Sequence, residues 1–293
     1  MFRVFRILAI WPLSVAFALS TASAQEFQMV QFPGAVTTIL SGGPNLEGTS
    51  VGDYTDTAGV THGFKLTEFG NFTSFDPPGS LFTTPNFISL EGVVVGGYLD
   101  AAGTSRGFVL KGGEYTTVNF PGAAGTILTG INPQGEIVGE SCEAALCNTI
   151  THSFILSKGV FTSFDPPGAI SSLAATVSAL GEVVGDYTDS VGNGHGYTLS
   201  HGTYTTIDPP GSAFTFAGGG NAEGDVVGQY FTANGDAFAF LLSKGVYTTF
   251  EAPGAGTSPG QGSGASGINL EGTIVGFYVD SAGATFGFIR TKY

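Results

Sequence analysis

The side chains best suited to chemistry are histidines and aspartates that recur at fixed positions along the chain. The histidines are His62, His152 and His195, and the aspartates are Asp56, Asp100, Asp189 and Asp280. Imidazoles brought together from several repeats can bind a metal ion or transfer protons, and carboxylates can bind cations. These seven residues are therefore the candidate binding residues of the sequence.

The three histidines share one repeat position, ten residues after a Val-Gly pair once an insertion in the third repeat is allowed for. Arg106, Phe238 and Phe286 take this position in the other repeats. Because phenylalanine replaces histidine there, the simpler interpretation is a half-buried partner across a strand pair. A metal site would require the position to line a central channel, and a catalytic role has less support still.

The four aspartates each begin an Asp-x-x-Gly turn, such as the one from Asp56 to Gly59. Aspartate at the start of a turn accepts a hydrogen bond from its own backbone two residues on. Calcium takes six to eight oxygen ligands, so one carboxylate per turn is few. No Ser-His-Asp order, paired-acid signature or phosphate loop is evident, so the sequence predicts no catalytic residues, no metal site and no cofactor.

A short unit that repeats six times must position these residues. Its anchor is a Val-Gly pair preceded by another glycine four residues before the anchor glycine. The anchors are Val51-Gly52, Val95-Gly96, Val138-Gly139, Val184-Gly185, Val227-Gly228 and Val275-Gly276, with steps of 44, 43, 46, 43 and 48 residues. A repeat of this length indicates a solenoid, a propeller or another array.

Each unit contains four strand-like runs separated by four turn signals. In the fourth unit the runs are Val160 to Phe164, Ala174 to Ser178, Glu182 to Tyr187 and His195 to Leu199. The first turn is Asp165-Pro166-Pro167-Gly168, in which proline fixes φ and glycine supplies a positive φ. No stretch shows helical apolar spacing, which excludes helical solenoids.

Four short antiparallel strands form one propeller blade, and six blades lie within the usual range. The predicted fold is all-β, a six-bladed β-propeller built from six four-stranded repeats of 43 to 48 residues that form one domain over residues 25–293. An open solenoid is the main alternative. The anchor glycines are expected to let neighbouring blades approach closely. Tyrosines two residues later are expected to pack over them: Tyr54, Tyr98, Tyr187, Tyr230 and Tyr278.

These motifs carry a family resemblance. The unit Phe-Thr-x-Phe-Asp-Pro-Pro-Gly, Gly-Ile-Asn, Gly-x-Val-Val-Gly-x-Tyr-x-Asp and His-Gly-Phe resembles the repeat of the HAF family, a group of probable extracellular bacterial repeat proteins. The resemblance extends over nearly the whole chain after residue 24 and implies secretion and repeat architecture. It implies no catalytic residues. Ser141 in place of the tyrosine and Thr232 in place of the turn aspartate argue against a strictly six-fold ligand site.

The N-terminus has the three parts of a secretory signal peptide. Arg3 and Arg6 precede an apolar run from Ile7 to Leu19, and Ala22-Ser23-Ala24 follows. We expect residues 1–24 to be removed; the alternative is an uncleaved anchor, but the run is shorter than the roughly 20 residues that span a bilayer. No later segment is apolar enough to span. The mature protein is predicted to be secreted, either extracellular or periplasmic.

The only two cysteines, Cys142 and Cys147, lie in one loop. In an exported chain they predict a local disulfide, since an exported protein leaves the reducing cytosol. The alternative is a Cys/His metal site, which would need four ligands, and only His152 is near.

The mature chain is strongly acidic. Removing the leader takes two of the nine basic residues and none of the 23 acidic ones, which leaves a formal charge of −16. Such a surface repels nucleic acid, which is therefore excluded as a partner. The charge favours solubility and weak cation binding.

Length variation points to one face of the expected ring. The long segment from Gly256 to Gly267 and the insertion around Cys142 and Cys147 both fall among the Pro-Gly and Asp-x-x-Gly turns. Because a rigid scaffold tolerates change where loops project, this face is predicted to hold specific recognition. Neutral surface insertions are the alternative.

The sequence favours a non-enzymatic, secreted binding or scaffold module whose ligand is a glycan, a wall polymer or a protein. The alternatives are an extracellular polymer-active hydrolase or lyase on a propeller scaffold, and a purely structural surface protein. Fold alone does not establish chemistry. The single tryptophan, Trp11, lies in the leader, which weakens a glycan-stacking version of the first hypothesis.

Overall fold

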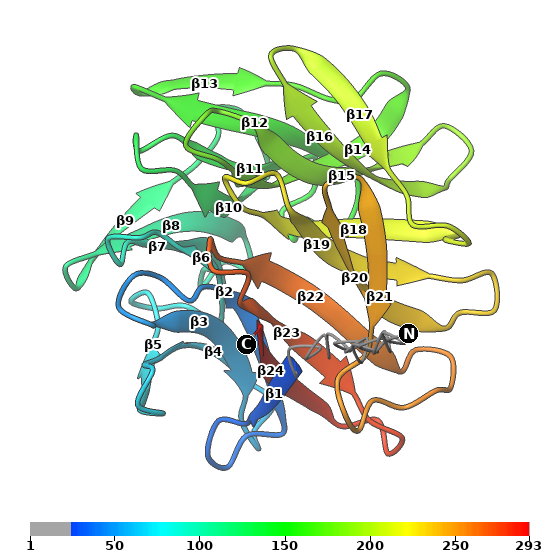
Figure 1. Cartoon of the computed structure of the whole chain (residues 1–293). Coiled ribbons are helices and arrows are strands. Elements are labelled where there is room, and N and C mark those ends of the chain that lie inside the picture. Colours follow the sequence, from blue (N-terminus) through cyan, green and yellow to red (C-terminus); the bar gives the residue numbers. More distant parts are fainter. Residues whose placement is uncertain (1–24, 293) are drawn as a thin grey trace, which may run out of the picture.

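The computed structural model describes residues 25–292, so the predicted signal peptide lies outside the described residues. Over these residues the chain forms 24 β-strands and no helix. Consequently, no described segment is a helix long and apolar enough to cross a membrane. The predicted all-β, six-bladed propeller is confirmed (Figure 1).

Each blade is a four-stranded antiparallel sheet whose strands follow one another from the centre outwards. The innermost strands are β2 (Thr37–Gly42), β6 (Phe82–Ile88), β10 (Gly125–Ile131), β14 (Ala169–Val177), β18 (Phe214–Gly220) and β22 (Gly262–Ile268). The second strands are β3 (Ser50–Thr55), β7 (Val94–Leu99), β11 (Ile137–Cys142), β15 (Val183–Asp189), β19 (Val226–Phe231) and β23 (Ile274–Val279). The third strands are β4 (Thr61–Leu66), β8 (Ser105–Lys111), β12 (Thr151–Ser157), β16 (Gly194–Ser200), β20 (Ala237–Ser243) and β24 (Thr285–Lys292). The outermost strands are β5 (Phe72–Phe75), β9 (Glu114–Val118), β13 (Val160–Ser163), β17 (Thr203–Ile207), β21 (Val246–Phe250) and β1 (Gln25–Val30).

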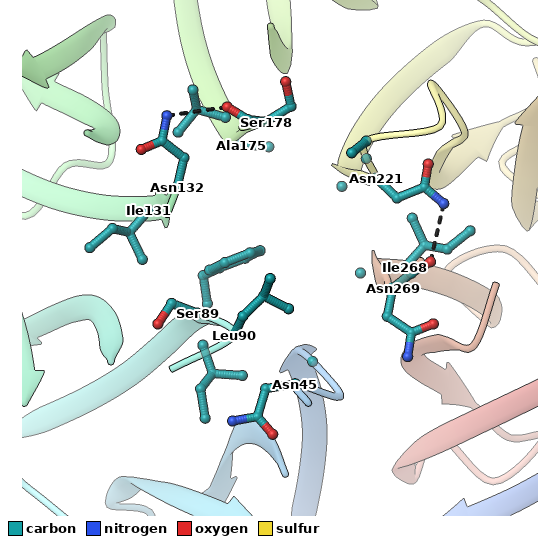
Figure 2. Close-up of a pocket in the computed structure, with 18 of the residues that line it drawn as sticks. Asn45, Ser89, Leu90, Ile131, Asn132, Ala175, Ser178, Asn221, Ile268 and Asn269 are labelled. Atoms are coloured by element: carbon teal, nitrogen blue, oxygen red, sulfur yellow. Dashed lines mark hydrogen bonds between the residues drawn. The ribbon is translucent and has the colours of Figure 1, made fainter. Parts of the chain in front are cut away.

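The innermost strands contact one another in a closed ring and surround a central channel. Figure 2 looks into one mouth of this channel. Each innermost strand contacts the innermost strands of both neighbouring blades. The last of them in the sequence, β22, contacts the first, β2. The ring is therefore closed, and the open solenoid is excluded.

The sixth blade is completed by the first strand of the chain. Strand β1 pairs with β24 over six residues, from Gln25 opposite Lys292 to Val30 opposite Gly287. Figure 1 shows the two strands side by side. The first run of each sequence unit is thus the outermost strand of the preceding blade, and the chain crosses to the next blade at the Pro-Gly turn.

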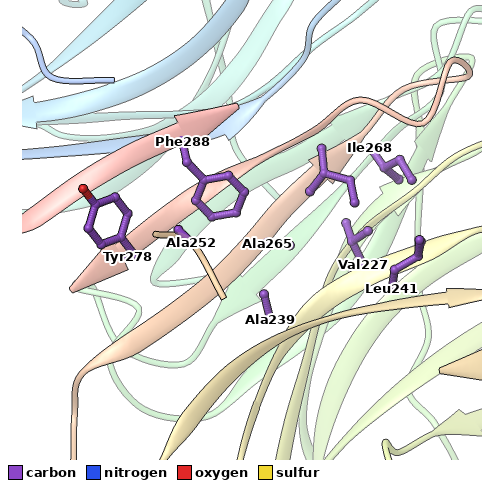
Figure 3. Packing of buried hydrophobic residues seen from close by; sticks show 9 residues of the cluster. Val227, Ala239, Leu241, Ala252, Ala265, Ile268, Tyr278 and Phe288 are labelled. Atoms are coloured by element: carbon purple, nitrogen blue, oxygen red, sulfur yellow. The ribbon is translucent and has the colours of Figure 1, made fainter. Parts of the chain in front are cut away.

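The hydrophobic core consists of six clusters, one between each pair of neighbouring blades. The cluster between blades five and six, drawn in Figure 3, packs Val227 and Leu241 against Ile274 and Phe288. The cluster that closes the ring joins Val30 and Val275 of blade six to Leu40, Phe64 and Leu66 of blade one. Burying one such side chain contributes about 1.5–3 kcal/mol, so the ring is held mainly by burial that no blade achieves alone.

The anchor glycines have a different role from the predicted one. A Cβ atom at Gly52 would lie 1.9 Å from the carbonyl oxygen of Ile39, which belongs to the innermost strand of the same blade. At Gly96 it would lie 2.2 Å from the oxygen of Thr84 and 2.7 Å from the ring of Phe108 on the third strand. The expectation of close approach between blades is therefore wrong for these glycines. In blades two to six a third-strand aromatic ring, rather than the predicted tyrosine, lies over the anchor glycine.

Blades approach each other closely at another glycine, in the third strand. A Cβ atom at Gly63 would lie 2.8 Å from Pro85, and one at Gly107 would lie 2.7 Å from Leu128; in each case the contact belongs to the next blade. This glycine is the middle residue of the His-Gly-Phe motif. The motif therefore combines a blade-packing glycine with the aromatic ring that follows it.

The predicted disulfide between Cys142 and Cys147 is present, with Cα atoms 5.0 Å apart. It closes the loop between β11 and β12 in blade three. The carbonyl oxygen of Ala145 in this loop accepts a hydrogen bond of 2.7 Å from the main-chain nitrogen of Ser105 in blade two. The disulfide loop therefore links two blades as well as two strands.

Candidate functional site

The turns divide between the two faces of the ring. The turns between innermost and second strands, which begin with Asn or Ser, lie on one face, called here the rim face. The turns that begin with Asp56, Asp100, Asp189 and Asp280 lie on the other, called here the Asp-turn face. Pro-Gly connections and both insertions share the Asp-turn face, as expected from antiparallel strands.

The four candidate aspartates serve their own turns. One carboxylate oxygen of each accepts hydrogen bonds from the main-chain nitrogens two and four residues later, at 2.8–3.0 Å. These backbone bonds are the main reason that the pKa values of Asp56 and Asp100 are lowered and that of Asp189 falls to about 2. The structure gives them a turn-forming role; a binding role stays a prediction.

The three candidate histidines lie on third strands, away from the channel. Each faces the expected cross-strand partner: His62 pairs with Tyr54, His152 with Ser141 and His195 with Tyr187. Their side chains are 25–39% exposed. Because they lie on separate blades, the structure does not bring them together, and among residues 25–292 no group of three or more His, Cys, Asp or Glu could hold a metal ion.

Each histidine instead bridges two acidic groups, one in the loop before its own strand and one in the Asp-Pro-Pro-Gly turn that leaves its blade. Nδ1 of His62 lies 2.7 Å from Asp76, and Nε2 lies 3.5 Å from Asp56. The hydrogen bond with Asp76 is the main cause of the raised pKa of His62. For His152 and His195, burial acts to lower the pKa, but the hydrogen bonds and charges of the neighbouring carboxylates outweigh it and the pKa is raised.

The rim face carries an axial funnel of about 180 Å³ at the mouth of the channel. All six blades contribute to its wall. The polar first residue of every rim turn lines it: Asn45, Ser89, Asn132, Ser178, Asn221 and Asn269. Figure 2 shows them arranged around the opening. The funnel is the place where one ligand could touch every repeat.

The rim asparagines fix the geometry of the mouth. The side-chain oxygen of Asn132 accepts hydrogen bonds from the main-chain nitrogens of Gln134 and Glu136 and thereby holds its turn. Its Nδ2 donates to the carbonyl oxygen of Ser178 in the next blade at 3.2 Å. Asn221 makes the same bond to Asn269 at 3.1 Å, and both are drawn in Figure 2. The mouth is therefore preorganised by bonds within and between blades.

An apolar residue follows the first residue of every rim turn. These residues are Leu46, Leu90, Pro133, Ala179, Ala222 and Leu270, called here the apolar collar. Leu46, Leu90 and Leu270 are 79%, 40% and 52% exposed, and all but Leu46 line the funnel. A turn residue facing water gains nothing in folding from being apolar, so a recurring exposed apolar position points to recognition.

Below the funnel the channel widens into a chamber of about 510 Å³. The funnel and the chamber share five wall residues: Asn86, Thr129, Ala175, Gly218 and Ser266. They are therefore parts of one axial cavity. The chamber wall also contains the carboxylates of Glu140 and Asp186, from the second strands of blades three and four.

Burial changes the acidity of these two groups. Desolvation raises the pKa of Glu140 to about 7, partly offset by a hydrogen bond with Thr151. Desolvation also raises the pKa of Asp186 to about 8, and the charge of Glu140 adds to the effect. Asp53 occupies the same repeat position in blade one, and burial raises its pKa to about 7. Neutral and charged forms of all three therefore coexist near neutral pH.

These three acids were not among the residues predicted from the sequence. Each is the residue directly after the anchor glycine, where the other repeats have Gly97, Gln229 and Phe277. Strand alternation could have indicated them. Each acid comes two residues after the buried anchor valine, and in a β-strand residues two apart point to the same side. A carboxylate at that position is a buried acid.

The insertion-bearing loops line two further cavities on the Asp-turn face. One lies under the long loop and is bounded by Phe238, Glu251, Thr257 and Gln261. Another lies beside Leu146 of the disulfide loop, between blades two and three. The structure thus places the insertions at edges between blades, and a recognition role for this face stays a prediction.

No known family model matches the sequence, so the resemblance to the HAF family stays a prediction from motifs. No curated protein matches it either. Solved structures do match. A putative TolB from Agrobacterium tumefaciens is 14% identical with a TM-score of 0.58, and the match covers 86% of this chain and 89% of that chain.

A fungal lectin, the Aleuria aurantia lectin, described as a six-bladed β-propeller with a novel fucose recognition mode, is 13% identical with a TM-score of 0.55; the match covers 89% of this chain and 93% of the lectin. The propeller domain of the Trilobed protease from Pyrococcus furiosus, described as having an open velcro topology, is 10% identical with a TM-score of 0.50 over 83% of this chain and 75% of that chain. At such identities the similarity shows the fold alone. The chain shares the six-bladed β-propeller fold with lectins and TolB.

Proposed function

We propose that the protein is an exported, non-catalytic binding module that receives part of an extracellular ligand in the axial funnel of the rim face. The apolar collar is the observation that carries this proposal. Its exposed leucines make no contribution to the six inter-blade clusters. The disulfide between Cys142 and Cys147 supports export, because such bonds persist outside the reducing cytosol.

The chemistry of the funnel fits a ligand that has both apolar and hydrogen-bonding surface. Leu90, Leu270 and Ile131 supply apolar contact, while the rim residues Asn45 and Ser89 supply polar groups. A sugar unit or a compact peptide segment has this character. The fucose recognition of the fungal lectin makes glycans the first ligand class to test.

The funnel competes with the Asp-turn face as the working surface. The Asp-turn face has the length variation, whereas the rim face has the central cavity and the apolar collar. A ligand in the funnel touches six repeats at once, whereas each cavity on the other face lies between two blades. Contact with all six repeats favours the rim face.

The experiment is a glycan, wall-polymer and protein binding array on the mature chain, run beside a polymer-cleavage screen. The test variant is Leu90→Asp with Leu270→Asp, which places charges in the collar without touching the blade cores. The control is Val191→Asp, which introduces the same kind of charge at a 79% exposed residue of the Asp-turn face. We expect binding to be lost in the collar variant and kept in the control.

Two results would contradict the proposal. Binding that survives the collar variant but disappears with Val191→Asp, or on shortening residues 256–264, would place the site on the Asp-turn face. Turnover of a polymer by the unmodified protein would replace the binding module by an enzyme.

A further inference from the structure

The chamber below the funnel contains two carboxylates that lack counter-charges. Glu140 is only 8% exposed, and Asp186 is half-buried in the chamber wall. Among residues 25–292, no lysine, arginine or histidine lines the funnel or the chamber. Asp186 has no hydrogen-bond partner in the same part of the chain. A buried carboxylate without a partner is costly when ionised, and a cationic ligand removes that cost.

The rest of the chamber wall indicates which kind of cation would fit. The rings of Phe216 and Phe277 and the side chain of Leu173 provide apolar and aromatic surface beside the acids. Aromatic faces attract ammonium groups, whereas a calcium ion would require six to eight oxygen ligands. Phe216 and Phe277 belong to blades five and six, so the acids and the rings face a common space.

Taken together, these observations lead us to propose that the axial chamber binds a protonated amine, held by Glu140 and Asp186, and that the ligand enters through the funnel. This inference rests on the proposed function and adds to it the charge of the ligand end that reaches furthest into the channel. The ammonium group lies between the two carboxylates and donates hydrogen bonds to them. The alkyl part of the ligand lies against Ala175 and the apolar wall towards the mouth.

Binding should release protons. Because burial raises the pKa values of Glu140 and Asp186 to about 7 and about 8, part of the carboxyl population is neutral at pH 7. An ammonium ion favours the ionised forms, so affinity rises with pH until both acids are ionised. The other titratable group close to Asp186 is the buried hydroxyl of Tyr197, whose pKa is raised by burial, so it stays neutral throughout this range.

The test compares two matched probes, 5-amino-1-pentanol and 1,5-pentanediol, by calorimetric titration of the mature protein at pH 6, 7 and 8. We expect the amine to bind at least tenfold more tightly than the diol at pH 8, with the preference reduced at pH 6. Repeating the titration in phosphate and in Tris buffers measures the released protons.

Variants identify the groups responsible. Asp186→Asn with Glu140→Gln should abolish the preference for the amine and the proton release. Glu271→Gln is the matched control, because it removes one negative charge from an exposed turn outside both cavities. The double variant loses buried charges and should fold at least as well as the parent protein, which circular dichroism checks.

The outcomes separate the two proposals. Equal affinity for amine and diol, a preference that survives in the double variant, or no binding of the amine overturns the amine site. If the array then still finds a ligand that the collar variant loses, the proposed function stands without it. If the amine binds through Asp186 but the collar variant binds every array ligand unchanged, the funnel fails as the recognition surface while the amine site stands.

Discussion

The Nδ1 atom of His195 lies 2.8 Å from Oδ2 of Asp208, and this contact ties the third strand of blade four to the turn that leads into blade five. Asp208 begins the Asp-Pro-Pro-Gly turn after β17. His62 and Asp76 repeat the arrangement in blade one. The recurring histidine therefore fastens the chain where it changes blades.

This contact predicts that the effect of His195→Phe on stability depends on pH. The folded-state pKa of His195 is raised, so its ion pair stabilises the protein below about pH 6.5 and the contribution disappears as pH rises through the folded-state value. Phenylalanine fits the site, as Phe238 does in blade five. We expect a loss of about 1 kcal/mol or less at pH 5.5 and a smaller loss at pH 9, measured by urea unfolding. A loss independent of pH would contradict the ion pair.

The chamber acids predict the opposite sign for Asp186→Asn. A carboxyl group whose pKa is raised to about 8 destabilises the fold as pH rises above its unfolded value of about 4, and the cost is complete above about 8. The asparagine variant should therefore be more stable than the parent protein by roughly 2–5 kcal/mol at pH 9 and equal to it at pH 4. Thermal unfolding from pH 4 to 9 measures this difference. A stability gain that does not grow with pH would show that Asp186 is not buried as described.

The strands, their number and the fold could be predicted from the sequence, because the residue types in the turns restrict the backbone φ angles there. Each Pro-Gly and Asp-x-x-Gly segment specifies φ values that only a few residues adopt, so strand ends follow directly. The assignment of strands to blades could not be predicted. A repeat looks the same wherever it is cut, and only the pairing of β1 with β24 defines which strand is outermost.

The site was less predictable than the fold. His62 and Asp56 were predicted as binding residues because they recur. They recur for structural reasons: Asp56 accepts hydrogen bonds within its turn, and His62 contacts Asp76 in the turn that leads to the next blade. Glu140 and Asp186 recur only loosely, since a channel position has no backbone requirement to keep it constant. The funnel arises from six turns far apart in sequence, so no local pattern describes its shape.

Two adjacent glycines should respond very differently to alanine. At Gly96 an added Cβ would lie 2.2 Å from a main-chain oxygen of the same blade, whereas at Gly97 the nearest atom is a side-chain carbon of Ile127 at 3.2 Å. We expect Gly96→Ala to cost about 3 kcal/mol or more and Gly97→Ala less than about 1 kcal/mol. Denaturant midpoints of the two variants measure this. Similar losses would mean that the anchor glycine is not needed for close packing within the blade.

Closure by β1 predicts a sharp contrast within that strand. Val30 is 4% exposed in the ring-closing cluster, whereas Gln28 points to solvent. Val30→Asp should destabilise the protein by about 3 kcal/mol or more, because it buries an unpaired charge, and Gln28→Asp by less than about 1 kcal/mol. Equal melting temperatures for the two variants would argue that β1 does not close the ring.

The disulfide predicts a limited effect of reduction. The ring that it closes is short, so replacing both Cys142 and Cys147 by serine should cost at most about 2–3 kcal/mol. The propeller should stay folded, because the six inter-blade clusters do not depend on the loop. Near-ultraviolet circular dichroism checks this, and global unfolding of the double variant would refute it.

The pairing of Gln25 with Lys292 makes the molecule topologically almost a circle. A short peptide joining these two positions would give a continuous closed chain, in which the sixth blade no longer differs from the others by combining strands from both ends of the chain. Such a closed chain could be reopened at any Pro-Gly connection to give a circular permutant. Each blade of the permutant would then be a single continuous segment of chain, and the ring would close by packing alone, without the clasp formed by β1 and β24.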